Sequence, residues 1–359
     1  MKKIILAILL LSSYVSYSQE KTFIREYTYK ASEADSKVSC RAIATSELRT
    51  ELLNELGVYV ESNDLLSSND AKGKFSQDFK EKISTITAGI TKFDILDEKW
   101  DGQTFWMKAS IKVDTTSLKE SLKRISEDHR KIRELNDMKQ RLDEANQKLA
   151  QLSQQLQQEK EENAKAAIAE KYNDQVNILN ATNLMYNAKS KYEANDYPGA
   201  IEEFNKVVSL DSKFTLAYAY RGHAKERTGN YVSAIDDFSQ AIALNPGFDA
   251  AYVDRGLARI YSHDYKNAAS DFSQAIRISP GYALAYGGRG EALLKMKDYP
   301  SALRDFDKAI RLDSTYALAY FGRGIAKQAT GQKGACADWN RSAQLGNRQA
   351  YEFMKLHCK

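Results

Sequence analysis

One pattern returns every 34 residues over the second half of the chain and constrains its fold more than any other feature. Written in register, the pattern consists of tyrosine, glycine, alanine and phenylalanine columns. The columns are Tyr218, Tyr252, Tyr286, Tyr320; Gly222, Gly256, Gly290, Gly324; Ala200, Ala234, Ala268, Ala302; and Phe204, Phe238, Phe272, Phe306. A period of this length is typical of arrays of helical hairpins, each of which buries its apolar face only against a neighbour. The pattern predicts an α-solenoid and favours a binding scaffold.

The repeats have a frame that can be compared with known repeat families. Counting from Ala181, Thr215, Asp249, Ala283 and Ala317, each unit has a large residue at position 4 and a small one at position 8. The first four units add alanine at position 20 and phenylalanine at position 24. Residues 181–348 therefore resemble five tetratricopeptide repeats. The resemblance implies paired helices with small residues at their closest approach, and a capping helix over residues 349–359.

A second pair of columns lies outside this frame. Arginines occupy position 7 of repeats two to five, and acids occupy position 23 of repeats one to four. The acids stop one repeat early and the arginines start one repeat late, so we expect pairing across each junction. The expected pairs, interpreted as a structural ladder, are Glu203 with Arg221, Asp237 with Arg255, Asp271 with Arg289, and Asp305 with Arg323.

The resemblance also implies where a partner would bind. Relatives hold ligands along the concave surface formed by the first helix of each repeat. The matching residues that we single out are His223, Arg227, Val253, Leu257, Tyr261, Glu291, Leu294, Phe321 and Ile325. Relatives that clamp a terminal carboxylate use lysines and asparagines that this surface lacks, so an extended or helical peptide with apolar anchors is the expected ligand. The alternative is that a helix of the same chain fills part of this surface.

The chain begins with the features of a signal peptide over residues 1–18. Lys2 and Lys3 precede an apolar run from Ile4 to Leu11, which is too short to span a bilayer. We expect cleavage before Gln19 and export to the periplasm or the medium of a bacterium. No cysteine follows the cut, which argues against a lipoprotein, and no later run is apolar enough for a membrane span.

Residues 19–113 mix helical and strand periodicity, which predicts a small α+β domain. We expect strands at 23–29 and 58–61, helices at 36–56 and 75–86, and a final hairpin with its turn at Asp101-Gly102. The expected stripe of the first helix includes Val38 and Leu52. This element order resembles small periplasmic domains of bacterial envelope proteins.

Residues 114–180 contain neither glycine nor proline and read as one long helix. Apolar residues spaced by three and four form a coiled-coil-like seam: Leu135, Met138, Leu142, Ala145, Leu149, Leu152 and Leu156. A narrow seam on a polar helix needs a partner, so we expect a homo-oligomer through residues 114–160. The alternatives are packing against residues 166–184 of the same chain and a single solvated helix.

Three cysteines are present, at positions 40, 336 and 358. Cys336 lies in the expected second helix of the last repeat and Cys358 at the end of the next helix, so a bridge between them would close the terminal hairpin. The sequence leaves open whether they are bridged or are two free thiols.

No catalytic, metal-binding or phosphate-binding motif stands out, and the net charge of +4 does not indicate nucleic-acid binding. We therefore expect no enzyme activity, cofactor or metal. The fold class is mostly α, with an N-terminal α+β domain, a long coiled-coil-like helix and a C-terminal α-solenoid. The leading hypothesis is an adaptor of the bacterial cell envelope that binds a protein or peptide. The alternative is an oligomeric spacer, whose module order is similar to that of periplasmic cell-division coordinators.

Overall fold

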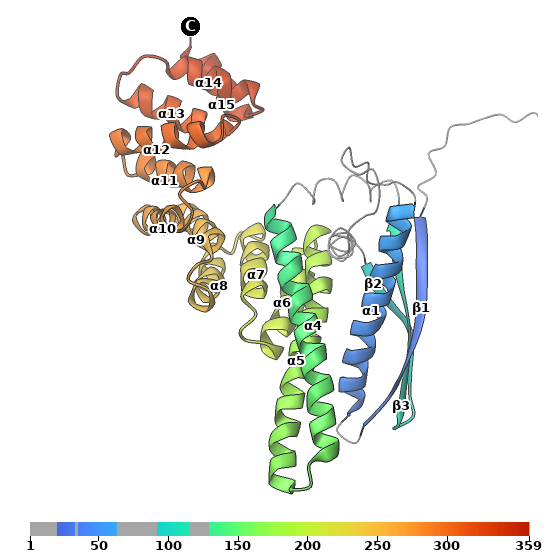
Figure 1. Cartoon of the computed structure of the whole chain (residues 1–359). Helices are drawn as coiled ribbons and strands as arrows, with labels where there is room; N and C mark the ends of the chain where they lie inside the picture. Colours follow the sequence, from blue (N-terminus) through green and yellow to red (C-terminus); the bar gives the residue numbers. More distant parts are fainter. Residues whose placement is uncertain (1–19, 33–34, 63–91, 115–128, 359) are drawn as a thin grey trace, which may run out of the picture. The chain divides into compact units, whose positions relative to one another are not determined.

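The computed structural model describes residues 20–32, 35–62, 92–114 and 129–358 (Figure 1). The expected signal peptide, the helix at 75–86 and the first part of the long helix lie outside these residues. The chain forms two compact units, of which the first ends at Val176 and the second begins at Asn177. Among the described residues, no helix is both long enough and apolar enough to cross a membrane.

The first unit contains a three-stranded antiparallel sheet with strand order β1-β3-β2. Its strands are β1 (Glu20–Lys30), β2 (Lys92–Trp100) and β3 (Thr104–Asp114), and helix α1 (Lys37–Ser62) packs on β1 and β3. The predicted final hairpin is confirmed, because β2 pairs with β3 and Gly102 adopts a left-handed φ of 98° in the turn. Alternate residues of β3, such as Phe105 and Met107, are buried beneath α1.

Two details of this domain differ from the sequence prediction. The strand expected at 58–61 is wrong, because α1 continues through Gly57 to Ser62. Glycine lowers helix propensity by about 1 kcal/mol relative to alanine, but it does not force a stop. Val38 was expected on the apolar stripe and is instead exposed, whereas Leu48 and Leu52 are fully buried as predicted.

The prediction of one long helix over residues 114–180 is also wrong. Helix α4 (His129–Gln158) ends before α5 (Glu162–Glu193) begins. At the break, the Glu159 carboxylate accepts hydrogen bonds from the backbone N–H groups of Lys160 and Glu161, at 2.8 and 3.0 Å. A side chain that binds nearby backbone groups in this way competes with helix continuation, without any glycine or proline. Helix α5 also continues through the expected domain boundary at residues 180 and 181.

The seam of α4 is covered within a single chain. Its described side chains are buried: Met138, Leu142, Ala145, Leu149, Leu152 and Leu156. On the same helix, Asn146 Nδ2 donates a 2.9 Å hydrogen bond to Ser46 Oγ of α1. The expectation of a homo-oligomer rested on an uncovered seam. Its burial inside the chain removes that premise over these residues.

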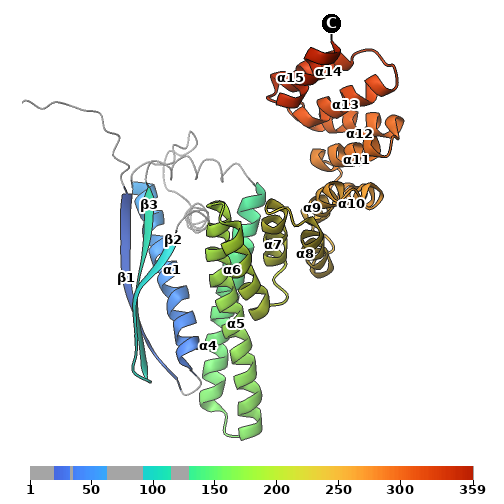
Figure 2. The same ribbon diagram turned by 180° about the vertical axis from the view of Figure 1, so that it is seen from behind.

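The second unit is a run of helical hairpins, as the repeat pattern predicts (Figures 1 and 2). After α5 the helices are α6 (Tyr197–Leu210), α7 (Thr215–Arg227), α8 (Tyr231–Leu244), α9 (Asp249–Tyr261), α10 (Tyr265–Ile278), α11 (Ala283–Lys295), α12 (Tyr299–Leu312), α13 (Ala317–Ala329), α14 (Ala335–Gln344) and α15 (Arg348–His357). Each hairpin contacts the next, and the first helices α7, α9, α11 and α13 also contact one another in succession. Helix α15 occupies the place of the predicted cap.

Each hairpin turn is built from the same two local devices. Position 15 adopts a left-handed backbone in every repeat, with φ between 61° and 81° at Asn195, Gly229, His263, Lys297 and Gly331. In the first four repeats, position 16 is an asparagine or aspartate whose side chain accepts a hydrogen bond from the backbone N–H three residues later. A reversed backbone followed by an N-cap ends one helix and begins the next within a few residues.

The glycine and phenylalanine columns meet inside the hairpins. The buried Phe238 ring lies so close to Gly222 that a Cβ atom there would be 2.7 Å from the ring. The same fit recurs at Gly256 with Phe272 and at Gly290 with Phe306. The sequence prediction that the small residue lets the two helices approach is therefore confirmed, with the aromatic ring filling the contact.

Candidate protein-binding surface

The ladder residues pair within each repeat, so the predicted pairing across the junctions is wrong. The observed pairs are Arg221 with Asp237, Arg255 with Asp271, Arg289 with Asp305 and Arg323 with Asp338. In each pair Nε and Nη2 of the arginine bind the two carboxylate oxygens, over distances from 2.5 to 3.0 Å. Positions 7 and 23 face each other across one hairpin, which allows this bidentate geometry.

The same arginines also cross the junctions, but through a different atom and partner. Nη1 of Arg255 donates to Ser239 Oγ of the preceding repeat at 3.0 Å, and Nη1 of Arg289 donates to Ser273 Oγ at 3.2 Å. Equivalent bonds join Arg221 to Asn205 and Arg323 to Asp307. The ladder therefore fixes both the hairpin and its stacking on the previous hairpin.

A second cation at position 11 was missed by the sequence analysis. Arg259 Nη1 lies 2.6 Å from Asp271, and Lys225 Nζ lies 2.8 Å from Asp237. In repeat one, where position 7 is Asn187, Glu203 pairs with Lys191 instead at 3.2 Å. Repeat five uses Asp338, one position earlier than the column predicts. The carboxylates of Asp237, Asp271, Asp305 and Asp338 are buried and each accepts hydrogen bonds from its arginine. Removing one partner of such a buried pair leaves the other uncompensated, so we interpret the ladder as structural.

The residues predicted to bind a partner lie on the first helices of repeats two to five, α7, α9, α11 and α13. We call the surface that these residues were predicted to form the first-helix surface. Of the nine predicted residues, Arg227 and Tyr261 are exposed, and Tyr261 has 57% of its surface accessible. His223, Leu257, Glu291, Leu294, Phe321 and Ile325 are half-buried. Val253 is fully buried, with no accessible surface, so its assignment to this surface is wrong. It packs with Ile260, Phe272 and Ala285 in the core between hairpins.

Phe321 is half-covered by another part of the same chain. Its ring meets that of Phe353 on α15 edge to face, with centroids 5.2 Å apart. The C-terminal helix therefore occupies the end of the first-helix surface. This contact matches the alternative in which a helix of the chain fills part of the surface. We call the part of the surface on α7, α9 and α11, away from this contact, the open part.

A polar cluster joins the first helices of repeats two and three. His223 Nε2 lies 3.2 Å from an oxygen of Asp254 on α9, and its Nδ1 lies 3.8 Å from Glu226. Burial opposes protonation of this imidazole, but the charges and hydrogen bonds of Asp254 and Glu226 outweigh it and raise the pKa of His223 to about 10. The imidazole is therefore a cation at neutral pH that connects two helices.

Aromatic rings flank this cluster. Tyr231 and Tyr261 stack with centroids 4.9 Å apart and planes 15° from parallel. The Arg227 guanidinium lies 5.4 Å from the Tyr197 ring and donates a hydrogen bond from Nε to Tyr197 Oη at 3.2 Å. The sequence analysis missed Tyr231 and Tyr197 because they begin the second helices, outside the positions at which relatives bind ligands.

On α11 the surface carries a half-buried acid, Glu291. Burial raises the pKa of its carboxyl, and the charge of Lys295 partly opposes this shift. Burial raises the pKa of the Tyr261 and Tyr316 hydroxyls, and the negative charge of Glu291 adds to the shift of both. The surface thus combines apolar, aromatic and charged side chains along the helices.

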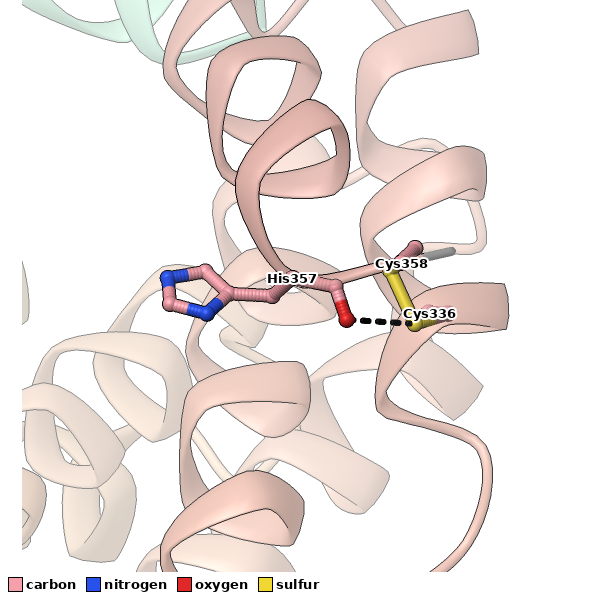
Figure 3. Close-up of a disulfide and its surroundings, with 3 residues drawn as sticks. All are labelled: Cys336, His357 and Cys358. Carbon is pink, nitrogen blue, oxygen red and sulfur yellow. Dashed lines mark hydrogen bonds between the residues drawn. A yellow bond between two sulfur atoms is a disulfide. The ribbon is translucent and has the colours of Figure 1, made fainter.

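The two C-terminal cysteines are joined in the structure. Cys336 on α14 and Cys358 after α15 form a disulfide across a sequence separation of 22 residues (Figure 3). Cys336 Sγ lies 4.0 Å from the carbonyl oxygen of His357. Cys40 is free and buried in the first unit. The bridge ties the last helix to the last complete hairpin.

The first unit contains a polar centre that the sequence analysis did not anticipate. The Asp35 carboxylate accepts hydrogen bonds from Tyr172 Oη at 2.5 Å, Ser39 Oγ at 3.0 Å and Tyr29 Oη at 3.1 Å. The Ser32 backbone N–H and hydroxyl each donate to it at 2.7 Å. Burial raises the pKa of Asp35, but these donors outweigh it and lower the pKa. The network ties α5 to the loop between β1 and α1.

A cavity of about 620 Å³ lies beside this network. Its walls come from the end of α4, the beginning of α5 and the loop residues Ala31 and Ser32. Within the described ranges, no three His, Cys, Asp or Glu side chains are grouped to hold a metal ion. The side chains of the first-helix surface and of the Asp35 network offer hydrogen bonds, aromatic rings and charges.

The fold of the second unit defines a class, a solenoid of stacked helical hairpins. The family descriptions that match the chain are those of the tetratricopeptide repeat, over residues 187–247 and 283–316. Residues 187–247 and 283–316 therefore carry tetratricopeptide repeats, as the comparison of positions 4, 8, 20 and 24 predicts for this part of the sequence. No curated protein sequence matches the chain.

Solved structures of several proteins are similar to about half of the chain. A crystal structure of MamA is 22% identical, covering 46% of this chain and 96% of its own, with a TM-score of 0.42. MamA from Desulfovibrio magneticus is 18% identical, with coverages of 47% and 96% and a TM-score of 0.43. YrrB, described as a TPR protein with an unusual peptide-binding site, is 18% identical, with coverages of 49% and 91% and a TM-score of 0.42.

Proposed function

We propose that this chain is a non-enzymatic adaptor of the bacterial cell envelope that binds a peptide or protein segment along its first-helix surface. The observation that carries the proposal is the contrast between two sets of positions on the same helices. The stacking positions, such as Gly256 and Val253, are buried, whereas Arg227 and Tyr261 face solvent. The array therefore holds a row of side chains on a rigid scaffold, which is how a peptide-binding surface is built.

The side chains suggest the chemistry of the partner. Tyr261 supplies an exposed aromatic ring, Leu257 and Leu294 supply partly open apolar surface, and Arg227 and Glu291 supply opposite charges. Tyrosine and arginine are enriched among residues that dominate binding energy at interfaces. The proposed partner is an extended or helical segment with apolar anchors and a mixed charge pattern.

Two features support export to the periplasm or the medium. The basic and apolar beginning of the chain has the composition of a signal peptide. The second feature is the bridge between Cys336 and Cys358, because structural disulfides persist in oxidising compartments and are rare in the cytosol. An oligomeric spacer built on residues 114–160 is less well supported, because the described part of its seam is buried within one chain.

Peptide display on the full chain tests the binding function. Enriched peptides are synthesised, and their affinities are measured by calorimetry for the wild type and for a Tyr261→Ala, Arg227→Ala double variant. We expect the double variant to bind at least about tenfold more weakly, because it removes an aromatic and an arginine contact.

The matched control is Tyr351→Ala, which removes an exposed tyrosine on α15, away from the open part of the surface. It should bind the selected peptides as the wild type does. Failure to enrich any peptide, or equal affinity of the double variant and the wild type, would refute the assignment of this surface.

A further inference from the structure

The last helix of the array buries little of its own surface. Helix α15 has ten residues, of which only Ala350 is fully buried. Tyr351 is exposed, and Leu356 has 73% of its surface accessible. An isolated helix of this length is marginal in water and depends on tertiary contacts. The covalent bridge therefore adds to the tertiary contacts that keep α15 in place.

The surface beneath α15 is strongly aromatic. Phe353 lies 5.2 Å from Phe321 of α13 and 5.7 Å from Trp339 of α14, as measured between ring centroids. His357 lies 5.8 Å from the Trp339 ring. With α15 in place, Trp339 is 1% exposed. Removal of the helix would uncover Phe321 and Trp339 together.

The bridge is accessible to a reductant. Cys336 is exposed at the beginning of α14, and Cys358 follows the last turn of α15 near the chain end (Figure 3). The third cysteine, Cys40, is buried in the first unit, where burial raises the pKa of its thiol to about 11. A buried thiol with a raised pKa is a poor nucleophile, so exchange at the bridge requires an external thiol.

We propose that the Cys336–Cys358 disulfide is a redox latch that controls access to the aromatic end of the array. One thiolate of an external dithiol attacks a bridge sulfur, the bridge S–S bond breaks, and a mixed disulfide forms. The second thiolate of the dithiol resolves it. The dithiol is oxidised to a disulfide, and the bridge takes up two electrons and two protons to become two thiols. Helix α15 then leaves the rings of Phe321 and Trp339.

This latch goes beyond the proposed binding function, because it needs no ligand on α7, α9 or α11. It changes how much of the first-helix surface is open at its C-terminal end, where Phe321 lies. In the oxidised form α15 covers part of that end. In the reduced form an apolar, aromatic surface is available.

Hydrogen exchange measured by mass spectrometry tests the latch on the full chain. A Cys40→Ser variant keeps only the two bridge cysteines, and it is compared with and without dithiothreitol. We expect reduction to speed exchange of the residue 348–357 amides by at least about tenfold, while exchange in α12 stays unchanged. The fluorescence of the apolar dye ANS should rise at the same time.

A Cys336→Ser, Cys358→Ser variant should show the fast exchange without reductant, and Tyr351→Ala should keep the slow exchange of the oxidised protein. Three results would overturn the proposal. The first is equal protection of α15 in both redox states. The second is loss of helicity across the whole array on reduction. The third is a bridge that dithiothreitol reduces only in denaturant.

Discussion

Asp271 offers the sharpest test of how the ladder stabilises the array. Its side chain is 4% exposed, accepts hydrogen bonds from Nε and Nη2 of Arg255 at 3.0 and 2.7 Å, and lies 2.6 Å from Nη1 of Arg259. Substitution by alanine leaves two guanidinium groups without their carboxylate. These groups are 16% and 20% exposed, so water compensates part of the loss.

Removing one partner of a fully buried ion pair costs about 3 to 5 kcal/mol, and partial exposure of the arginines reduces this to roughly 2 to 4 kcal/mol for Asp271→Ala. For a folded unit of this size, 1 kcal/mol corresponds to about 2 to 4 °C in Tm. We therefore expect a loss of roughly 4 to 16 °C, measured by circular dichroism. Asp236→Ala removes an exposed aspartate beside Asp237 in the preceding repeat; it is the matched control and should change Tm by less than about 2 °C.

A double-mutant cycle decides which arginine is the partner. Asp271→Ala combined with Arg255→Ala should show a coupling of about 1 to 3 kcal/mol, and the combination with Arg289→Ala should be nearly additive. Strong coupling to Arg289 with none to Arg255 would refute the pairing within repeats. A change in Tm of less than 2 °C for Asp271→Ala would refute the energetic reasoning.

Three further perturbations follow from local geometry. Lys297→Gly should stabilise the array by about 1 kcal/mol in urea unfolding, because Lys297 has a left-handed φ of 63°. Gly256→Ala should destabilise it by about 1 to 3 kcal/mol in the same assay, because the new Cβ would lie 2.9 Å from the Phe272 ring. The raised pKa of His223, about 10, contributes stability that is fully present below the unfolded pKa near 6.5 and is lost as the pH rises through 10. Wild-type Tm should therefore fall more steeply than that of His223→Gln between pH 7 and 10.

Each of these predictions has a control. Lys295→Gly lies in the helical end of α11 and should destabilise rather than stabilise. Gly281→Ala has no atom near the new Cβ and should be close to neutral. His263→Gln changes an exposed histidine and should keep the pH slope of the wild type. Identical slopes for the wild type and His223→Gln would contradict the charged state assigned to His223.

The hairpins could be predicted because their determinants are local and repeated. Phe272 and Gly256 recur every 34 residues, and this period predicts the helix pairs. Asp264 caps the second helix of its repeat by accepting a hydrogen bond from the backbone N–H of Asn267, three residues later. The sheet hairpin at Asp101-Gly102 was predictable for the same reason, since strand alternation and turn chemistry lie within a short stretch. Such signals do not depend on the rest of the fold.

The break between α4 and α5 could not be predicted in the same way. No glycine or proline marks it. At the break the Glu159 side chain accepts hydrogen bonds from nearby backbone N–H groups, and on α4 Leu149 and Leu156 are buried within the chain. An apolar seam on a helix shows that something covers it, but it does not show whether that is a second copy or the same chain.

The sequence by itself determined the period and the hairpin units, because each repeat carries the same short-range signals. Only the tertiary structure decided which charges meet. Asp237 lies 16 residues after Arg221 and 18 residues before Arg255. These spacings are nearly equal along the chain, but only the first is bridged by a single hairpin, so the carboxylate reaches Arg221. The buried Val253, the half-covered Phe321 and the bridge at Cys336 depend in the same way on neighbours that only the stacked array provides.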